Sequence, residues 1–140
     1  MKKVQISTDA TAGIVGYDQI VVTPDQGISM DEYSDNSCDS IFAPDILDSY
    51  SIQNHQPLIG RMVKKLRRGG SIVIGGTNIS SFCKTFINGV MSEQDSSAII
   101  SKATSMTRPD SAEKIIRGLG LEIVTISLDG LHFELKAKRG

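Results

Sequence analysis

Short apolar runs alternate with polar, turn-forming stretches in the N-terminal part of the chain. Residues 4–7 form an alternating run that predicts a strand, and the small, polar residues 8–16 predict a turn-rich connection. Residues 19–23 are β-branched and nearly all apolar, which predicts a strand buried on both faces. After an acidic, turn-forming segment, residues 40–43 predict a third short strand, and residues 45–51 predict a loop or a single turn.

The middle of the chain carries a clear helical pattern. Apolar residues recur at helical spacing over residues 56–66, and Pro57 suits the first turn. Gly69 and Gly70 mark the end of this predicted helix, since glycine is the usual residue just beyond a helix C-terminus. Residues 71–74 form another apolar run and predict a second strand that is buried on both faces.

Further helices and a hairpin complete the predicted order. We expect helices through residues 82–87, over the short segment 97–102 and over the well-marked segment 110–119. Residues 121–128 and 131–138 predict two strands, and the Asp-Gly pair that joins them is a strong hairpin signal. The order strand, strand, strand, helix, strand, helix, helix, hairpin indicates an α/β protein with an antiparallel hairpin at its end.

The composition is that of one ordinary soluble domain. The 140 residues include 39% hydrophobic and 22% charged side chains, so we expect a single compact unit over residues 1–140. The formal net charge of -1 argues against broad contacts with nucleic acid or an anionic membrane. No apolar stretch is long enough for a membrane span or a signal peptide, so we expect a cytoplasmic protein or a component of a large soluble assembly.

Three segments of the chain match the motifs of one family in the correct order. Residues 34–48 (SDNSCDSIFAPDILD), 63–74 (VKKLRRGGSIVI) and 118–124 (GLGLEIV) resemble segments of small class I S-adenosylmethionine-dependent methyltransferases. The resemblance implies a three-layer Rossmann-like methyltransferase fold, reduced in size, with a mostly parallel sheet and a C-terminal antiparallel hairpin. It also implies S-adenosylmethionine (SAM) as a cofactor, bound at the carboxyl edge of the sheet.

The positions that would bind SAM depart from the family's pattern. In the family the first strand ends in a glycine-rich motif, and the second ends in an acid that holds the ribose hydroxyls. Here Ser7 and Asp9 stand where glycines belong, and Val21 or Val22 stands where the acid belongs. The candidate cofactor-binding residues are Ser7, Thr8, Asp9, Asp25, Ala43, Pro44 and Asp45. Plain turns also explain the polar residues after both strands, because Ser and Asp readily bond to nearby backbone.

Two charged clusters have functional and ordinary interpretations. Four acids suggest acid–base chemistry or a divalent metal: Asp35, Asp39, Asp45 and Asp48. Solvated loop positions are the simpler explanation, and no metal site is expected. Five cations suggest a phosphate contact: Arg61, Lys64, Lys65, Arg67 and Arg68. Their place at a helix C-terminus, where cations favour the helix dipole, is the simpler explanation of this cluster.

The remaining chemistry-bearing residues give weaker expectations. His55, near a helix start, is expected at the surface, and His132, in a hairpin strand, can face either way. Cys38 and Cys83 are expected to be packed thiols. The Gly75–Gly76 pair is expected to let a ligand or another chain approach the sheet edge.

Two classes of function follow from this contrast between a matching framework and departing ligand positions. The preferred hypothesis is a methyltransferase-like pseudoenzyme in which SAM binding is weakened or lost. It would serve as a structural or interaction module, with protein partners or self-association through residues 91–109 and the terminal hairpin. The alternative is an active SAM-dependent methyltransferase for a small molecule, sugar or protein group. Methyl transfer needs mainly positioning, so the lack of an assigned catalytic residue does not exclude it.

Overall fold

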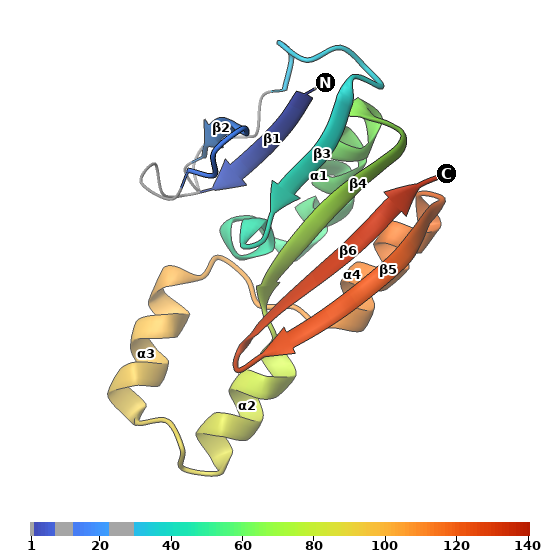
Figure 1. Cartoon of the computed structure of the whole chain (residues 1–140). Helices are drawn as coiled ribbons and strands as arrows, with labels where there is room; N and C mark the ends of the chain where they lie inside the picture. Colours follow the sequence, from blue (N-terminus) through green and yellow to red (C-terminus); the bar gives the residue numbers. More distant parts are fainter. Residues whose placement is uncertain (1, 8–12, 23–29) are drawn as a thin grey trace.

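The computed structural model describes residues 2–7, 13–22 and 30–140, which form a mixed sheet of six strands with attached helices (Figure 1). The strand order is β2-β1-β3-β4-β6-β5, in which β1 to β4 are parallel and β6 is antiparallel to both neighbours. The strands are β1 (Lys2–Ser7), β2 (Asp18–Val21), β3 (Cys38–Ala43), β4 (Leu66–Thr77), β5 (Leu121–Asp129) and β6 (His132–Arg139). The predicted α/β class and the C-terminal hairpin are confirmed.

The helical segments follow the predicted order along the chain. They are the 3-10 turn η1 (Ile46–Ser49) and the helices α1 (Ile52–Lys65), α2 (Ile79–Ile87), α3 (Glu93–Lys102) and α4 (Pro109–Gly118). α3 is longer than the expected short helix because Ser92 caps it, accepting a hydrogen bond from the backbone N–H of Asp95 at 3.0 Å. α1 and α4 lie side by side behind the sheet (Figure 1).

The core lies between these two helices and the sheet. α1 presents Leu58, Ile59 and Met62 to the sheet, and all three are fully buried. Their spacing places them on one face of a helix with 3.6 residues per turn. From the strands, Ile41 and Ile72 lie opposite each other in the register and are also fully buried. The apolar residues that recur at helical and strand spacing in the sequence therefore pack into a single continuous core.

No helix covers the opposite face of the sheet in the part of the chain that the structure describes. The register aligns Gln5, Phe42, Val73 and Lys136 across this open face. Phe42 and Val73 are half-buried, so β4 alternates between covered and open positions and is not buried on both faces as predicted. The expected three-layer arrangement has a helical layer on each face of the sheet. The described residues form the layer on one face.

Residues 13–17, before β2, lie over part of the open face. The backbone N–H of Ile14 donates to Oε1 of Gln5 at 2.9 Å, and the hydroxyls of Tyr17 and Ser40 lie 3.3 Å apart. β2 is the edge strand of the sheet and is largely exposed, so the prediction that it is buried on both faces was wrong. Apolar β-branched residues do not distinguish an edge strand from a central one.

The glycine pair at 69 and 70 lies inside β4 and not at the helix end. α1 ends at Lys65, and β4 begins with the next residue. Residues 67–70 of β4 bulge opposite the single residue Asp39 of β3. Gly69 has φ of +78°, a backbone conformation that favours glycine. These glycines therefore shape a bulge between helix and strand, which corrects the predicted role as a helix terminator.

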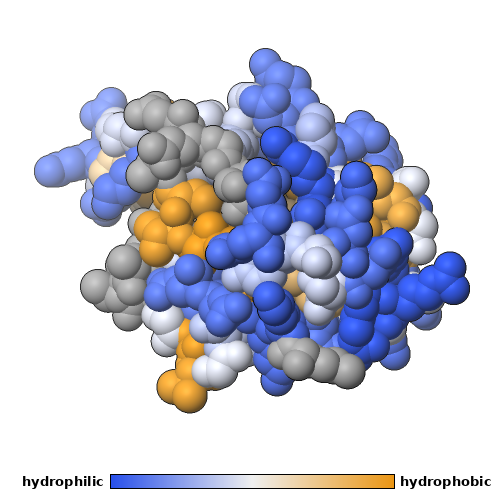
Figure 2. Space-filling model, turned by 90° about the horizontal axis from the view of Figure 1, so that it is seen from above, coloured by the Kyte–Doolittle hydropathy of each residue, from blue (hydrophilic) through white to orange (hydrophobic). Residues whose placement is uncertain are grey.

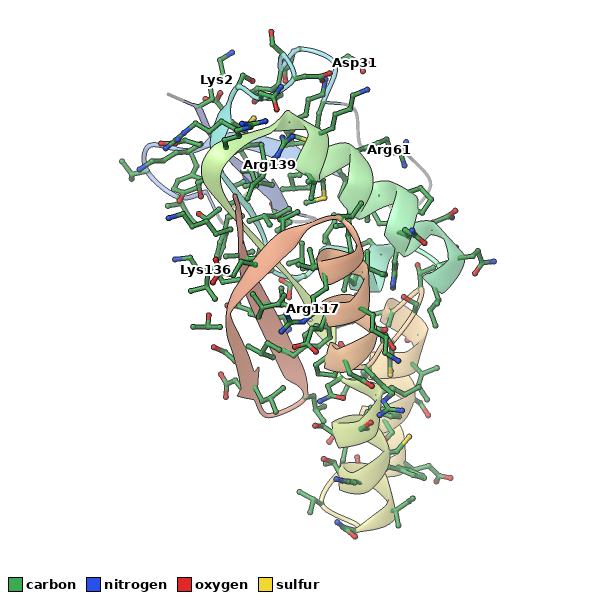
Figure 3. All side chains as sticks on the ribbon, turned by 90° about the vertical axis from the view of Figure 1, so that its right-hand side faces the viewer. Lys2, Asp31, Arg61, Arg117, Lys136 and Arg139 are labelled. Atoms are coloured by element: carbon green, nitrogen blue, oxygen red, sulfur yellow. The ribbon has the colours of Figure 1, made fainter. Side chains whose placement is uncertain are left out.

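The helices α2 and α3 extend beyond the carboxyl end of β4 as a projecting hairpin (Figure 1, Figure 3). At the other end of the molecule, the view from above shows a mainly hydrophilic surface on which hydrophobic residues gather in separate patches (Figure 2). Among the described residues, no helix has both the length and the apolar character needed to cross a membrane.

Candidate functional site

The strand order places a topological switch point between β1 and β3. The chain moves from β1 outward to β2 on one side, and from β3 outward to β4 on the other. In open parallel sheets such a point leaves a crevice outside the carboxyl ends of the two central strands. β1 ends at Ser7 and β3 ends at Ala43, and the pairing of Gln5 with Phe42 places these two ends next to each other.

The structure brings four of the seven candidate residues to this edge. Ser7 ends β1, and Ala43, Pro44 and Asp45 end β3 and begin the following turn. The other three candidates, Thr8, Asp9 and Asp25, lie outside the described residues. All seven remain predicted ligand contacts.

The end of β2 is apolar where the resembled family carries an acid. Val21 ends the strand and is 45% exposed, whereas Val22 is buried. The backbone N–H of Val22 donates to the carbonyl of Ser7 at 2.9 Å, which ties the ends of β1 and β2 together. Among the described residues, the end of β2 next to Ser7 therefore carries no carboxylate.

The Gly75–Gly76 pair allows the chain's own atoms to approach, not an incoming ligand. A Cβ on Gly75 would lie 2.3 Å from the carbonyl oxygens of both Pro44 and Phe133. A Cβ on Gly76 would lie 2.9 Å from Oδ1 of Asp48. The expectation that this pair opens the sheet edge was wrong, because the space beside each glycine is filled by neighbouring chain.

The carboxylate of Asp48 is engaged within the fold. Its Oδ1 accepts the backbone N–H of Thr77 at 2.7 Å, and its Oδ2 accepts the Thr77 hydroxyl at 2.8 Å. The carbonyl of Asp48 accepts the backbone N–H of Thr104 at 2.7 Å. Asp48 therefore joins η1 to the end of β4 and to the segment after α3.

An acid–imidazole–acid row lies at the same edge. Nδ1 of His132 is 3.4 Å from Oδ1 of Asp45, and its Nε2 is 3.5 Å from Oε1 of Glu134. The His132 side chain is about one-third exposed, so it can exchange protons with solvent. Sequence reasoning did not find this row because its members come from β6 and from the turn after β3. Only the pairing of β4 with β6 brings them together.

His55 is buried, which corrects the expectation that it lies at the surface. Its Nε2 is 2.9 Å from the carbonyl of Leu47 and 3.0 Å from that of Tyr50. The hydroxyl of Ser105 lies within hydrogen-bond distance of both carbonyls and of His55 Nε2. This network satisfies carbonyls at the end of η1, so His55 and Ser105 have a structural role.

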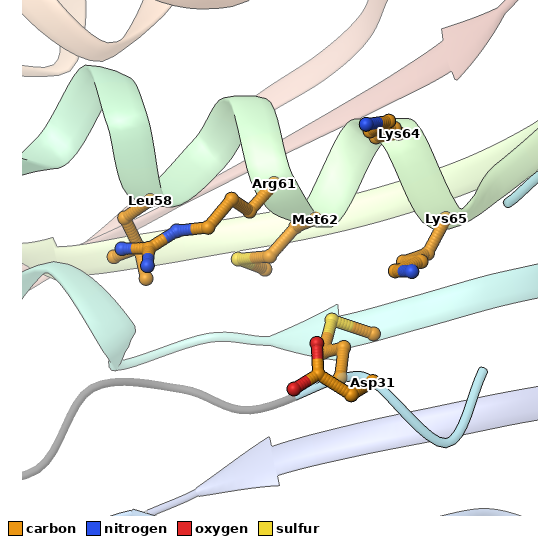
Figure 4. Close-up of a pocket in the computed structure, with 7 residues that line it drawn as sticks. Asp31, Leu58, Arg61, Met62, Lys64 and Lys65 are labelled. Atoms are coloured by element: carbon orange, nitrogen blue, oxygen red, sulfur yellow. The ribbon is translucent and has the colours of Figure 1, made fainter. Parts of the chain in front are cut away.

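The basic cluster borders a groove of about 320 Å³ along α1 (Figure 4). The groove is lined by Met30, Asp31, Leu58, Arg61, Met62, Lys64 and Lys65. Nζ of Lys65 is 3.0 Å from Asp35 and Nζ of Lys64 is 3.9 Å from the same carboxylate. The hydrogen bond from Lys65 lowers the pKa of Asp35. Charge in this cluster is thus partly neutralised.

Asp35 and Asp39, two acids of the cluster singled out in the sequence, form ion pairs. Asp39 pairs with Arg67 across the β4 bulge, as Asp35 does with Lys65. Within the described ranges, no three or more His, Cys, Asp or Glu side chains are arranged to hold a metal ion. Cys38 is a buried thiol, as expected, and burial raises its pKa, whereas Cys83 is exposed.

Comparison with known proteins finds similarity in solved structures alone. No family model and no curated protein matches the chain. A SAM-dependent methyltransferase from Archaeoglobus fulgidus aligns with a TM-score of 0.61 at 12% identity, over 88% of this chain and 68% of that one. The plantazolicin methyltransferase, solved with SAH, gives 0.62 at 10% identity, over 99% and 68%. The magnesium protoporphyrin IX methyltransferase from Synechocystis PCC 6803, with bound SAH, gives 0.53 at 13% identity, over 95% and 55%.

The chain has the fold of class I SAM-dependent methyltransferases. It spans between 35% and 68% of the length of the solved structures that it resembles. The fold therefore fits a SAM site at the switch point, but the described residues do not fit the ligand set that the resemblance implies. The end of β2 offers valines where the family carries an acid.

Proposed function

We propose that this chain is a methyltransferase-like domain that binds SAM weakly or not at all. It serves as a non-catalytic structural or interaction module in a larger assembly. A fold and its site are separable, because the core can persist when ligand-facing residues change. The framework here matches the methyltransferase fold over most of the chain, whereas the described end of β2 lacks the acid that the family uses to bind SAM.

The apolar end of β2 is the observation that carries this proposal. A carboxylate can accept hydrogen bonds from two ribose hydroxyls, whereas a valine leaves both hydroxyls without a protein partner. A polar group left without a partner on binding costs about 1–3 kcal/mol. The loss of this one contact lowers affinity by about one to two powers of ten.

One observation supports the alternative, an active methyltransferase. The row of Asp45, His132 and Glu134 lies at the carboxyl edge of the sheet, and its imidazole is in reach of solvent. Such a histidine can accept a proton from an acceptor hydroxyl or amine as it becomes methylated. Under this alternative, the domain acts on a small molecule, sugar or protein group.

Restoring the acid at the end of β2 tests the proposal. Val21 is suitable for the variant Val21→Asp because its side chain is already half exposed, whereas an acid at the buried Val22 would disturb folding. We expect SAM to leave the thermal unfolding midpoint of the wild type unchanged and to raise that of Val21→Asp. Val21→Asn is the matched control for size, and it should respond less than the aspartate variant.

The same experiment can contradict the proposal. Two results together would establish the alternative. SAM would clearly raise the unfolding midpoint of the wild type, and the wild type would transfer methyl groups at a rate that His132→Ala reduces. Equal stabilisation of the wild type and Val21→Asp would show that the end of β2 does not limit binding.

A further inference from the structure

The hairpin formed by α2, α3 and residues 88–92 between them, here called the arm, carries several large apolar side chains that the fold leaves exposed. Five of them are exposed: Ile79 by 39%, Phe86 by 46%, Ile87 by 79%, Val90 by 79% and Ile100 by 57%. The sum of their exposed fractions corresponds to three fully exposed side chains. At about 150 Å² for a large apolar side chain, this amounts to about 450 Å².

The two helices of the arm do not close on each other. A groove of about 340 Å³ separates them near the sheet, between Ile79, Phe82 and Cys83 of α2 and Ile100 of α3. A second hollow of about 110 Å³ continues it toward the tip, past Phe86. Neither helix packs closely against the sheet. Isolated helices of 9 and 10 residues are marginal in water, so the arm lacks the packing that usually stabilises such helices.

We propose that the arm docks against the arm of a second copy of this chain, in an antiparallel arrangement about a two-fold axis. This inference rests on the proposed function as an interaction module. Two such helix pairs would complete a four-helix arrangement in which each groove receives apolar side chains from the partner. A standard dimer interface buries about 800 Å² per partner, of which about 65% is apolar at its core. The patch of about 450 Å² is close to that requirement.

The charges of the arm complement one another in this arrangement. The arm helices carry two cations, Lys84 and Lys102, and two acids, Glu93 and Asp95. None of the four forms an ion pair with another described residue. The acids lie in the first turn of α3 at the tip, and Lys102 lies in its last turn near the body. Antiparallel docking brings the acids of one copy to Lys102 of the other, twice in each dimer.

Sedimentation velocity over a concentration series tests the proposal. We expect the wild type to show a concentration-dependent monomer–dimer equilibrium. The double variant Ile87→Asp with Val90→Asp should raise the dissociation constant at least tenfold, because it places charges in the apolar contact. Both side chains are 79% exposed, so the monomer should stay folded. The double variant Val15→Asp with Leu128→Asp is the matched control, since it makes the same change at two exposed sites outside the arm. It should change the constant less than twofold.

Charge reversal tests the orientation independently of the apolar contacts. Lys102→Glu should weaken the dimer, and adding Glu93→Lys to the same chain should restore it, because residue 102 meets residue 93 of the second copy. All variants should keep the thermal unfolding profile of the monomer. A wild type that stays monomeric at millimolar concentration overturns the proposal, as does an arm variant that dimerises like the control. Failure of the charge swap to restore the dimer overturns the antiparallel arrangement.

The outcomes separate this inference from the proposed function. A monomeric chain that does not bind SAM overturns the docking of the arm and leaves the loss of cofactor binding intact. A dimeric chain that binds SAM saturably overturns the proposed function and leaves the docking intact.

Discussion

Asp48 holds Thr77 by both of its carboxylate oxygens, one on the backbone N–H and one on the hydroxyl. This pair joins the turn after β3 to the end of β4 at the carboxyl edge of the sheet. The Asp48 carboxylate is therefore occupied inside the fold. Asp48 stabilises the edge of the sheet and does not present a free carboxylate there.

Removal of the Asp48 carboxylate should destabilise the fold. Hydrogen bonds to a charged group contribute about 1.5–3 kcal/mol each, and partial exposure of Asp48 reduces their sum. We expect Asp48→Ala to lower the free energy of unfolding by about 2–3 kcal/mol in urea titrations. Asp48→Asn keeps one acceptor for the Thr77 N–H and should cost about half as much. Equal stability of wild type and Asp48→Ala would show that the two bonds contribute nothing.

Gly75 should not tolerate a side chain. Gly75→Ala places Cβ 2.3 Å from two backbone carbonyl oxygens, so the strands must move apart. We expect a loss of about 3 kcal/mol or more, or no folded protein. Gly60→Ala is the matched control, because Gly60 lies within α1 with no atom within 4 Å of the added Cβ. Alanine there should raise stability by about 0.5–1 kcal/mol. A folded Gly75→Ala of normal stability would contradict the internal role of this glycine.

Tyr33 should make stability depend on alkaline pH. Burial, with the nearby carboxylates of Asp18 and Glu32, raises the pKa of Tyr33 to about 12. Its hydroxyl donates to Asp18 at 3.3 Å. The unfolded chain ionises this tyrosine near pH 10, so its contribution is complete below that pH and is lost as pH rises toward 12.

The variant Tyr33→Phe isolates this effect from other alkaline titrations. Between pH 10 and 11 the wild type should lose about 1 kcal/mol more unfolding free energy than Tyr33→Phe. The measurement is a pair of urea titrations at each pH. Parallel losses in the two proteins would show that Tyr33 ionises at the same pH in the folded and unfolded states.

Much of the fold could be predicted because it depends on local pattern. The apolar spacing of α1 and the Asp-Gly turn between β5 and β6 act over a few residues, and both elements are confirmed. α1 begins earlier than predicted, so Pro57 lies inside the helix and not in its first turn. The burial of β2 could not be predicted in this way, because an edge strand and a central strand have the same composition. The absence of a second helical layer over the described open face likewise depends on how the connections cross the sheet.

The candidate site depends on contacts between distant residues, which the sequence does not display. Asp45 and His132 come close through the pairing of β4 with β6, and the buried His55 meets Ser105, which is 50 residues away in the chain. The meaning of Gly75 was also hidden, since a glycine that admits a ligand and one that admits backbone look alike. The apolar positions Val21 and Val22, by contrast, could be identified from the motif alignment, and the structure places them at the end of β2.

A calorimetric titration of the wild-type chain with SAM tests the central claim most directly. Our account predicts no saturable heat with SAM up to millimolar concentration, because the described end of β2 carries valines where the family carries the acid that holds the ribose hydroxyls. Saturable binding at one site per chain with micromolar affinity would contradict it.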